Sequence, residues 1–353
     1  MAYTTVDNPE LYFQTKLYTG NGSNGHAITL DGDENMQPDW VWIKDRGSNS
    51  HRLTDSVRGA TKVMYSDLNF AEVTDADTIQ SFDSNGFTLD DDADTNGNGQ
   101  NFVSWNWKAG GSAVTNNDGD ITSTVSANNT AGFSIVTWTG DGSGANVGTG
   151  LSGSETLGFA TVKKRSTTSE WFTGVYGAYA SNARNFAYHL ELNSTSALSG
   201  SSPYMMGTQT SGNPTKLKLA SEGYVNGVTY VAYVFKPVKG YSAMGAYTGN
   251  GNADGPFIYT GFRPAWVLQK NAGASQGWQL QDNKRLGYNP DNYLLQPHTS
   301  QAESALQRVD LLSNGFKVRT TDAGQNSSGT TYIYMAFAES PFVNSKGVPT
   351  NGR

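Results

Sequence analysis

Three hexapeptides decide the fold: Phe102-Val103-Ser104-Trp105-Asn106-Trp107, Tyr230-Val231-Ala232-Tyr233-Val234-Phe235 and Tyr332-Ile333-Tyr334-Met335-Ala336-Phe337. Side chains of a β-strand point alternately to its two faces. One face of each hexapeptide therefore carries three large apolar side chains, whereas the other face mixes sizes and polarity. We predict that each hexapeptide is a central strand of a sheet and buries its large face in the core of its own module.

Three further patterns recur upstream of these hexapeptides. An aromatic residue followed by a Gly-Asn-Gly type of turn occurs at 18–22, 138–142 and 247–251, and a strand ending in lysine occurs at 38–44, 157–163 and 264–270. A Ser-Asn-Gly-Phe turn occurs at 84–87 and 313–316, with a degenerate version near Asn213 and Pro214. Self-similarity at a regular offset marks a repeat architecture, here three tandem modules of roughly 110 residues.

Turn chemistry predicts short strands and little helix. Asn-Gly occurs nine times, and this dipeptide favours the tight turns of β-hairpins because both residues adopt positive φ. The best helical pattern covers about 300–312, where spaced apolar residues could line one or two turns. We therefore predict an all-β chain of three antiparallel β-sandwiches.

The repeat also sets the module boundaries. An N-terminal arm covers residues 1–11, module one 12–110, a linker strand with module two 111–240, module three 241–342 and a C-terminal tail 343–353. Within the linker, Ile121, Ser123 and Val125 alternate with two threonines, which predicts an edge strand.

Composition excludes several classes of protein. The 353 residues include no cysteine, so disulfides and thiolate chemistry are absent. The net charge of −7 and the scattered basic residues argue against a nucleic-acid partner. No apolar run is long enough for a membrane helix. The first ten residues have neither the basic nor the apolar region of a signal peptide, which predicts release by another route, such as cell lysis.

Several segments resemble an uncharacterised family of tailed-bacteriophage proteins that is common in marine phages. The resemblance lies in Tyr12–Gly22, Gln37–Lys44, Val57–Ala60, Trp105–Gly111 and Gly119–Trp138. It extends over most of the chain and is weaker in modules two and three. There Phe159 and Thr161 replace two tryptophans, and Ala338-Glu339 stands where module one has Lys108-Ala109.

The resemblance implies a virion-associated protein whose modules are similar to concanavalin-like (laminin-G-like) jelly-roll sandwiches. It implies assembly in the host cytoplasm, release by lysis, and other virion proteins of the tail, fibre or capsid as partners. It brings no known catalytic site, and we expect neither an enzyme nor an obligatory cofactor. Two roles remain open: a tail or tail-fibre adhesin that binds host-surface glycans, and a capsid decoration protein. An adhesin should have a shallow groove with exposed aromatic side chains.

One acidic loop matches the first half of a calcium-binding loop. Asp90, Asp92, Asp94 and Asn96 place oxygen atoms at alternate positions before Gly97, an arrangement that suits a hard cation. Val103 stands where the closing glutamate of such a loop is expected, and the equivalent loops, Ser221–Thr229 and Thr320–Thr330, lack the run of acids. A solvated hairpin turn is therefore the competing interpretation.

Other chemistry depends on aromatic and acidic side chains. Trp171 and Trp278 are candidates for stacking on sugar rings, although their matching positions, shared with Leu53, also suggest packing. We assign Trp40, Trp42, Trp105, Trp107 and Trp266 to the core. A remote alternative is a polysaccharide hydrolase, which needs two nearby carboxyl groups. The available acids, which form no specific motif, are Asp31, Asp33, Glu34 and Asp55. The four histidines are scattered and predict no metal site.

The polar ends of the chain suggest an assembly. Termini of this composition fray unless contacts hold them, and residues such as Asp7 and Lys346 offer little apolar area for docking. We predict a homo-oligomer or larger complex in which neighbouring subunits hold both ends. The alternative is that both ends pack back on their own modules.

Overall fold

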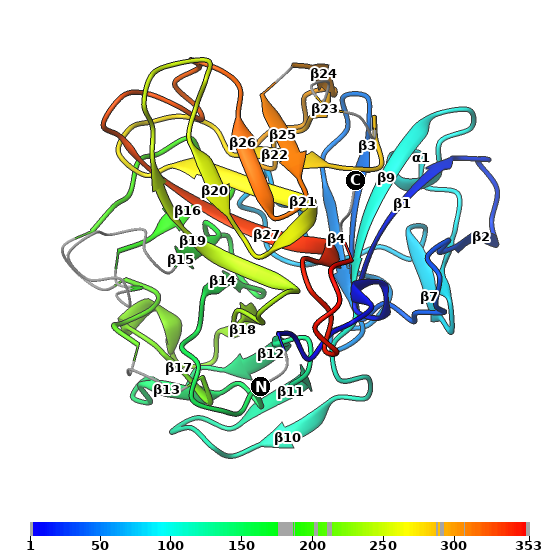
Figure 1. Ribbon diagram of the computed structural model, residues 1–353. Helices are drawn as coiled ribbons and strands as arrows, with labels where there is room; N and C mark the ends of the chain where they lie inside the picture. Colours follow the sequence, from blue (N-terminus) through cyan, green and yellow to red (C-terminus); the bar gives the residue numbers. More distant parts are fainter. Residues whose placement is uncertain are drawn as a thin grey trace.

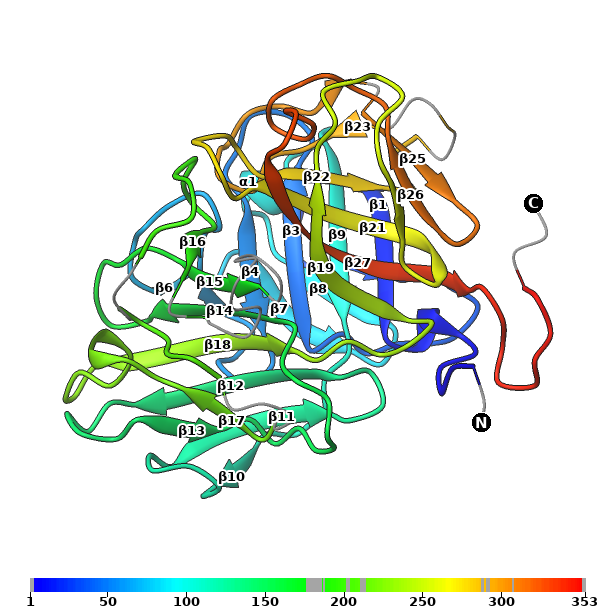
Figure 2. The same cartoon turned by 60° about the vertical axis from the view of Figure 1, so that its left-hand side comes forward.

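A computed structural model describes residues 3–175, 186, 188–200, 204–209, 214–286, 289, 293–306 and 308–350. Strands make up 43% of the chain and helices 3%, which confirms the all-β prediction. Several antiparallel sheets surround a common centre (Figures 1 and 2). Among the described residues, no helix has the length and apolar character needed to cross a membrane.

Module one consists of a four-stranded sheet backed by a three-stranded sheet. The first has the order β1 (Phe13–Thr19), β9 (Asn101–Trp107), β3 (Trp40–Asp45), β4 (Arg52–Asp55), and the second β2 (His26–Thr29), β8 (Gly86–Leu89), β7 (Ile79–Asp83). A small ladder joins β5 (Lys62–Val63) to β6 (Val73–Thr74).

Module two has a wider sheet because the linker adds two strands to it. The order is β10 (Val114–Asn116), β11 (Ser123–Asn128), β12 (Phe133–Thr139), β18 (Thr229–Phe235), β14 (Phe159–Lys164), β15 (Phe172–Val175), β16 (Leu190–Glu191). A second sheet pairs β13 (Asn146–Gly148) with β17 (Lys216–Lys218). The predicted linker strand is therefore present as β11, although the edge position belongs to β10. Asn213 of the degenerate turn lies outside the described residues.

Module three repeats the plan of module one. Its four-stranded sheet has the order β19 (Ser242–Thr248), β27 (Thr331–Pro341), β21 (Phe262–Asn271), β22 (Gln279–Asp282). Its second sheet has the order β20 (Phe257–Tyr259), β26 (Gly315–Val318), β25 (Val309–Leu312), and a short ladder joins β23 (Tyr293–Leu294) to β24 (Ser304–Ala305).

The described helices are three single turns. They are η1 (Pro9–Leu11), α1 (Ala93–Asn96) and η2 (Ser221–Gly223). The helix predicted over about 300–312 is wrong, because this segment forms β24 and β25. Val309 and Leu311 are buried and alternate with less buried neighbours, so a period of two governs the pairing of β25 with β26.

The three closing strands are central, as predicted, and occupy equivalent positions. Each pairs on one side with the strand that leads into the aromatic-glycine turn (β1, β12 or β19) and on the other with the strand that ends in lysine. Trp105, Tyr233 and Met335 are equivalent by this pairing, since they face Trp42, Thr161 and Leu268 respectively.

The large faces of the closing strands do not lie in separate cores, and this corrects the prediction. They meet in one buried cluster that includes Trp105, Trp107, Tyr233, Phe235, Met335 and Phe337. Trp40 of module one stacks on Tyr233 of module two with ring centroids 4.1 Å apart. Phe235 of module two meets Phe337 of module three at 5.5 Å. The three modules therefore share a centre, because one sheet of each is too apolar on its inner face to remain solvated.

The opposite face of each closing strand forms the core of its own module. Phe102 packs with Ile28 and Phe87 in module one, and Tyr334 packs with Phe316 and Val309 in module three. Module two has a larger cluster that includes Trp138 and Tyr230. The closing strands are thus buried on both faces, between the common centre and an outer sheet.

Three equivalent lysines explain why one repeated strand ends in lysine. Lys44, Lys163 and Lys270 are all fully buried, and each ammonium group donates to two backbone carbonyls. Lys163 reaches Asn69 O of module one, and Lys270 reaches Thr195 O of module two. Burial lowers the pKa of each lysine to about 8. Lys163 and Lys270 therefore join neighbouring modules at the cost of desolvation, whereas Lys44 bonds within module one.

A buried ionic network joins module one to module two. Asp55 and Arg58 are ion-paired and fully buried, and the hydroxyl of Tyr233 donates to Asp55 at 2.8 Å. Glu72 then links Arg58 to Arg165 of module two at 3.1 and 2.9 Å. Consecutive ion pairs therefore connect module one to module two.

The junction between modules three and one repeats this network residue by residue. Asp282 pairs with Arg285, and the indole N–H of Trp105 donates to Asp282 at 3.0 Å. Glu303 links Arg285 to Arg46 at 3.0 and 2.6 Å. Between modules two and three, Val175 stands in the position of Asp55 and Asp282, so that junction is apolar there.

Both ends of the chain pack on their own molecule. Val6 is buried in the common centre, and the Tyr3 hydroxyl donates to Gly261 O at 2.9 Å. Asp7 accepts hydrogen bonds from the backbone N–H and hydroxyl of Ser345. The described parts of the arm and tail thus follow the alternative interpretation. The prediction of a homo-oligomer loses its argument from the termini and stays a prediction.

Candidate functional site

The predicted calcium loop is held by side chains that serve the fold. The amide of Asn96 donates to Asn21 Oδ1, Ser23 O and Asp90 O at 3.1, 3.0 and 2.7 Å. Its carbonyl oxygen accepts from the Asn21 N–H at 2.9 Å. Asn96 therefore fastens this loop to the first hairpin of module one.

Module three contains the same asparagine clamp without the acidic run. Asn326 donates to Asn250 Oδ1, Asn252 O and Thr320 O at 3.1, 2.7 and 2.7 Å. Of the four acids at 90–94 this loop keeps only Asp322, at the position of Asp92. The recurrence of the clamp without the other acids assigns Asn96 to turn stability.

The acids of the loop face an arginine and a glutamine. Asp94 and Asp92 both pair with Arg52, whose guanidinium lies over the ring of Tyr65 at 4.5 Å. Burial is the main cause of the raised pKa of Asp92. Asp90 accepts from the amide of Gln80 at 2.6 Å. In the part of the chain that the structure describes, no three His, Cys, Asp or Glu side chains gather as metal ligands would.

The two candidate stacking tryptophans lie in the common centre and cannot meet a ligand. Trp171 and Trp278 both have 0% exposure. The indole N–H of Trp171 donates to Tyr65 O at 2.7 Å, and that of Trp278 donates to Glu191 O at 2.8 Å. Each tryptophan thus fastens its module to the carbonyl of the preceding module.

His51 completes this ring of hydrogen bonds and occupies the position equivalent to the two tryptophans. It precedes Arg52 of β4 as Trp171 precedes Phe172 of β15, so the earlier match to Leu53 is corrected. His51 Nδ1 accepts from the indole of Trp42 at 2.8 Å, and Nε2 lies 3.2 Å from Gln296 O of module three. Burial lowers the pKa of His51 well below its ordinary value, which suits a neutral ring that donates through Nε2.

The five tryptophans assigned to the core are all at most 3% exposed, which confirms that prediction. The four acids considered for hydrolysis do not form one site. Asp31 is 60% exposed and pairs with Lys16, whereas Asp55 is enclosed with Arg58. Asp33 and Glu34 are exposed residues of the segment between β2 and β3.

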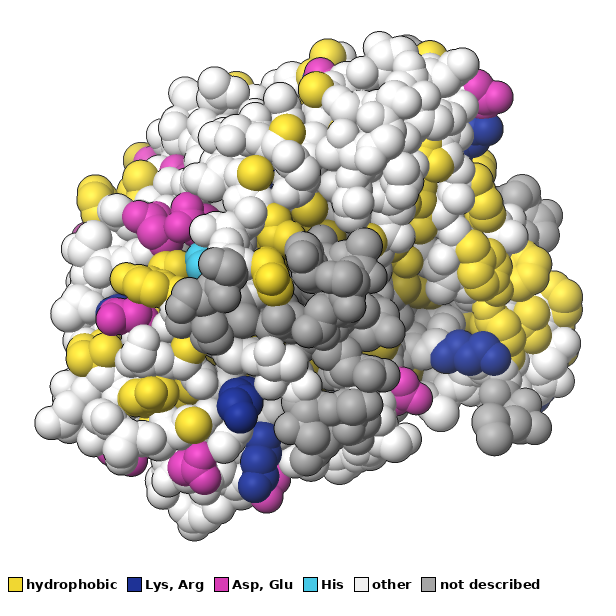
Figure 3. Space-filling model, turned by 90° about the vertical axis from the view of Figure 1, so that its left-hand side faces the viewer, with side chains coloured by type: hydrophobic (Ala, Val, Ile, Leu, Met, Phe, Trp, Pro, Cys, Tyr) yellow, Lys and Arg dark blue, Asp and Glu magenta, His cyan; other side chains and the backbone are white. Residues whose placement is uncertain are grey.

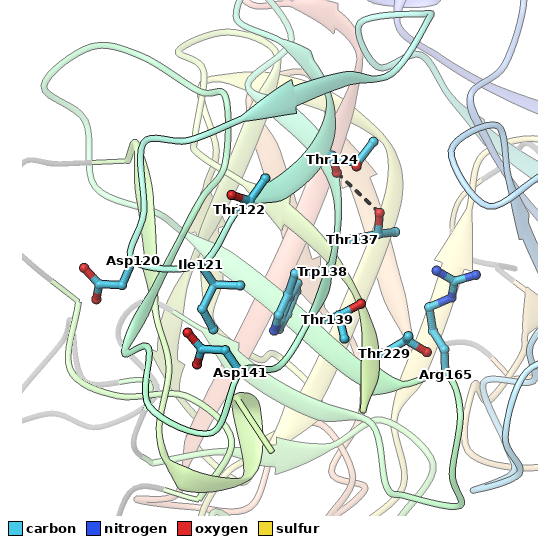
Figure 4. Close-up of a pocket in the computed structure, with 10 residues that line it drawn as sticks. All are labelled: Asp120, Ile121, Thr122, Thr124, Thr137, Trp138, Thr139, Asp141, Arg165 and Thr229. Atoms are coloured by element: carbon cyan, nitrogen blue, oxygen red, sulfur yellow. Dashed lines mark hydrogen bonds between the residues drawn. The ribbon is translucent and has the colours of Figure 1, made fainter. Parts of the chain in front are cut away.

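A threonine-lined hollow of about 510 Å³ opens beside the widened sheet of module two (Figure 4). Two aspartates stand at one end and Arg165 at the other. Asp141 accepts from the Ser143 and Gly144 N–H groups, which lowers its pKa, and Arg165 is paired with Glu72. The charges of this hollow are therefore already satisfied within the protein.

Module one has a hollow of about 560 Å³ at the matching place. Arg46 and Asn101 line it at the positions that Arg165 and Thr229 occupy in the first hollow. In both hollows the backbone N–H of the arginine donates to the backbone carbonyl of the second residue. Apart from this pair, unrelated residues line the two hollows, so they indicate no shared ligand chemistry.

An aromatic groove of about 460 Å³ on module two is different. Its walls include Phe172 on β15, His189 and Tyr204. The Phe172 ring lies 5.0 Å from the rings of both His189 and Tyr204, measured between centroids. Tyr204 is 46% exposed. Hydrophobic and acidic side chains and a histidine lie near one another on this side of the molecule (Figure 3).

Two carboxylates complete the groove. Glu170 precedes Trp171, and Glu191 lies on β16. Glu170 accepts from the amides of Asn69 and Asn193, so it is anchored. Burial and the nearby charge of Glu170 raise the pKa of Glu191. The described lining is therefore aromatic and acidic, with no lysine or arginine.

Modules one and three have polar side chains at the position that Phe172 occupies in the groove. Arg52 of module one and Gln279 of module three are equivalent to Phe172. Arg52 is stacked on Tyr65, which is equivalent to Glu191, and is closed by Asp94. In module two, by contrast, the apolar ring of Phe172 lies beside Glu170 and Glu191. This departure from its sister modules makes the groove the candidate functional site.

Part of this groove was accessible to sequence reasoning. Once Trp171 is assigned to the core, strand alternation places Glu170 and Phe172 on the opposite face. His189 and Tyr204 gave no such signal, because they follow a segment without a counterpart in the repeat.

Comparisons with known proteins give a family and no function. No curated protein and no solved structure matches the chain significantly. One family model, described as a domain of unknown function (DUF7483), matches residues 8–341 and so includes all three modules. The chain belongs to the DUF7483 family.

Proposed function

We propose that the chain is a non-enzymatic structural protein of a tailed-bacteriophage virion, placed in the tail or its fibres, that binds host-surface glycans through the aromatic groove. We further propose that its modules are diverged concanavalin-like or laminin-G-like jelly rolls, and that the virion assembles in the host cytoplasm and leaves by lysis. The segments that resemble marine-phage proteins support the virion setting.

The groove is the observation that carries the adhesin role. An exposed Tyr204 ring beside Phe172 offers an apolar surface, and carboxylates beside it accept hydrogen bonds. Ligand sites combine such apolar surfaces with a few polar groups that fix orientation. Sugar rings present both an apolar face and hydroxyl donors, so they match this combination.

Binding is favoured over hydrolysis at the same groove. Glycosidases also use two carboxyl groups, one with a raised pKa. Here both oxygens of Glu170 accept from amides, which leaves this carboxylate less available for acid or base work. The apolar space lined by Trp40, Trp107 and Phe235 at the common centre has only about 10 Å³, room for one water molecule at most.

A glycan array with a matched pair of variants tests the proposal. Tyr204→Ala should weaken glycan binding about tenfold or more, because aromatic anchors dominate binding energy. Phe257→Ala is the control, since Phe257 is also 46% exposed but lies on module three. Equal effects of the two variants, or release of reducing sugar from a bound polysaccharide, would refute the proposal.

A capsid decoration role is the second candidate, and one feature of module three favours it. Phe257 and Tyr259 on the edge strand β20 are 46% and 57% exposed. The equivalent residues of β2 are Ala27 and Thr29, so the fold does not require aromatics there. An exposed aromatic edge suits attachment to another protein. Locating the protein on intact particles, with and without Phe257→Ala and Tyr259→Ala, separates head from tail.

A further inference from the structure

We propose that the aromatic groove of module two selects glycans that carry a free, protonated amino group, such as glucosamine residues. This inference rests on the proposed glycan-binding function and specifies its ligand class. Its basis is the geometry of two carboxylates, Glu170 and Glu191, beside the rings of Phe172 and Tyr204.

The described lining of the groove is negatively charged. Both acids line the groove, together with His189, Ser199 and Gly200, and none of the described lining residues is a lysine or arginine. Glu170 is fixed by Asn69 and Asn193 and cannot turn away without breaking those bonds. A ligand entering here removes water from both carboxylates, which is costly unless it supplies a positive charge.

The ring that a ligand can reach is that of Tyr204, which is 46% exposed, whereas Phe172 is 5% exposed and supports it from below. The two rings lie 5.0 Å apart between centroids with planes inclined by 40°. An ammonium group over an aromatic face is attracted by the ring quadrupole. One protonated amine can therefore contact a ring and a carboxylate together, while the sugar ring packs on Tyr204.

Module one differs from module two at the equivalent positions. There Arg52 of the protein itself lies over the Tyr65 ring at 4.5 Å and pairs with Asp94. That arrangement is an internal cation held between an aromatic ring and a carboxylate. Module two has Phe172 at the position of Arg52 and Glu191 at the position of Tyr65, so a ring and an acid stand there and no described lysine or arginine lines the groove between them. A cation from the ligand completes the arrangement.

Calorimetric titration of the full chain with two oligosaccharides tests this inference. The probes are a tetramer of β-1,4-linked glucosamine and its fully N-acetylated counterpart, at about pH 6, where amines are protonated. We expect the amino tetramer to bind about tenfold or more tightly, because hydrogen bonds to charged groups are the strong ones.

Three variants give the inference its controls. Glu191→Gln should abolish the preference for the amino tetramer and leave binding of the acetylated tetramer unchanged. Glu34→Gln removes one negative charge from an exposed turn and should keep the preference. Tyr204→Ala should weaken both tetramers to a similar extent, and it remains informative if Glu191→Gln fails to fold.

The outcomes separate the two proposals. Equal binding of the tetramers, or a preference that survives in a folded Glu191→Gln variant, overturns the amino-group inference and leaves glycan binding intact. Loss of the preference in the Glu34→Gln variant also overturns it, since general charge would then be the cause. Failure of both tetramers to bind overturns this inference, and an empty glycan array in addition overturns the proposed function.

Discussion

The buried pair of Asp55 and Arg58 offers the sharpest test of how the modules are joined. Asp55 accepts from Arg58 Nε, from the Tyr233 hydroxyl and from the N–H groups of Val57 and Arg58. Both side chains are fully buried. Asp55→Ala would leave the guanidinium with Glu72, Leu53 O and the Tyr233 hydroxyl as its partners.

The expected cost follows from this geometry. Removing one partner of a buried ion pair costs roughly 3–5 kcal/mol, and the remaining bond to Glu72 places Asp55→Ala at about 3 kcal/mol. Arg58→Ala should cost about the same. The double variant leaves no uncompensated charge, so it should also cost about 3 kcal/mol rather than the sum of about 6 kcal/mol. The coupling free energy is therefore about 3 kcal/mol.

Urea unfolding followed by circular dichroism measures each corner of the cycle. The matched control is Lys16 with Asp31, a surface pair at 3.1 Å in which Asp31 is 60% exposed. Its coupling should stay below about 1 kcal/mol. A coupling at Asp55 and Arg58 no larger than that of the surface pair would refute the idea that the buried network joins the modules.

Two further predictions concern the repeated residues. Because the pKa of Lys44, Lys163 and Lys270 is about 8 in the folded chain, the unfolded chain binds more protons between about pH 8 and 10. The free energy of unfolding should therefore rise with pH over that interval in chemical denaturation, and a flat profile contradicts this. Asn96→Ala and Asn326→Ala should each cost about 3 kcal/mol, since each clamp makes several hydrogen bonds. The loss of stability measured by differential scanning calorimetry should be the same in calcium and in a chelator for both variants. A loss that depends on calcium for Asn96→Ala alone would support a calcium-binding loop instead.

The alternation of side chains predicted the strands well and their partners poorly. The segment 102–107 forms part of β9, with Trp105 and Trp107 buried as expected. An apolar face reveals that something covers it but not which surface does so. In module two, Tyr230, Ala232 and Val234 make the second face of β18 apolar as well. Two buried faces require three layers, and this signal for a shared centre was present in the sequence.

In module one, the second face of the closing strand carries polar residues, so the sequence does not show that this face is buried. Ser104 and Asn106 occupy the second face of β9, yet both are fully buried. Asn106 donates to Gln14 O of the neighbouring strand and to Ser104, so its NH2 group is satisfied inside the module, although its Oδ1 has no hydrogen-bond partner. Sequence polarity indicates exposure only when such local partners are absent.

Comparison of the three modules separates what the fold requires from what it permits. His51, Trp171 and Trp278 close one ring of hydrogen bonds around the common centre, so a tryptophan there needs no ligand to explain it. The next residue in each strand lies on the opposite face and takes no part in this ring of hydrogen bonds. In module two alone that residue is a phenylalanine, Phe172, with acids beside it. A residue that departs from its sister positions, remains exposed and serves no junction is therefore the better candidate for function. Tyr204 and the groove beside it are the candidate because they can contact a ligand, whereas the more conspicuous tryptophans cannot.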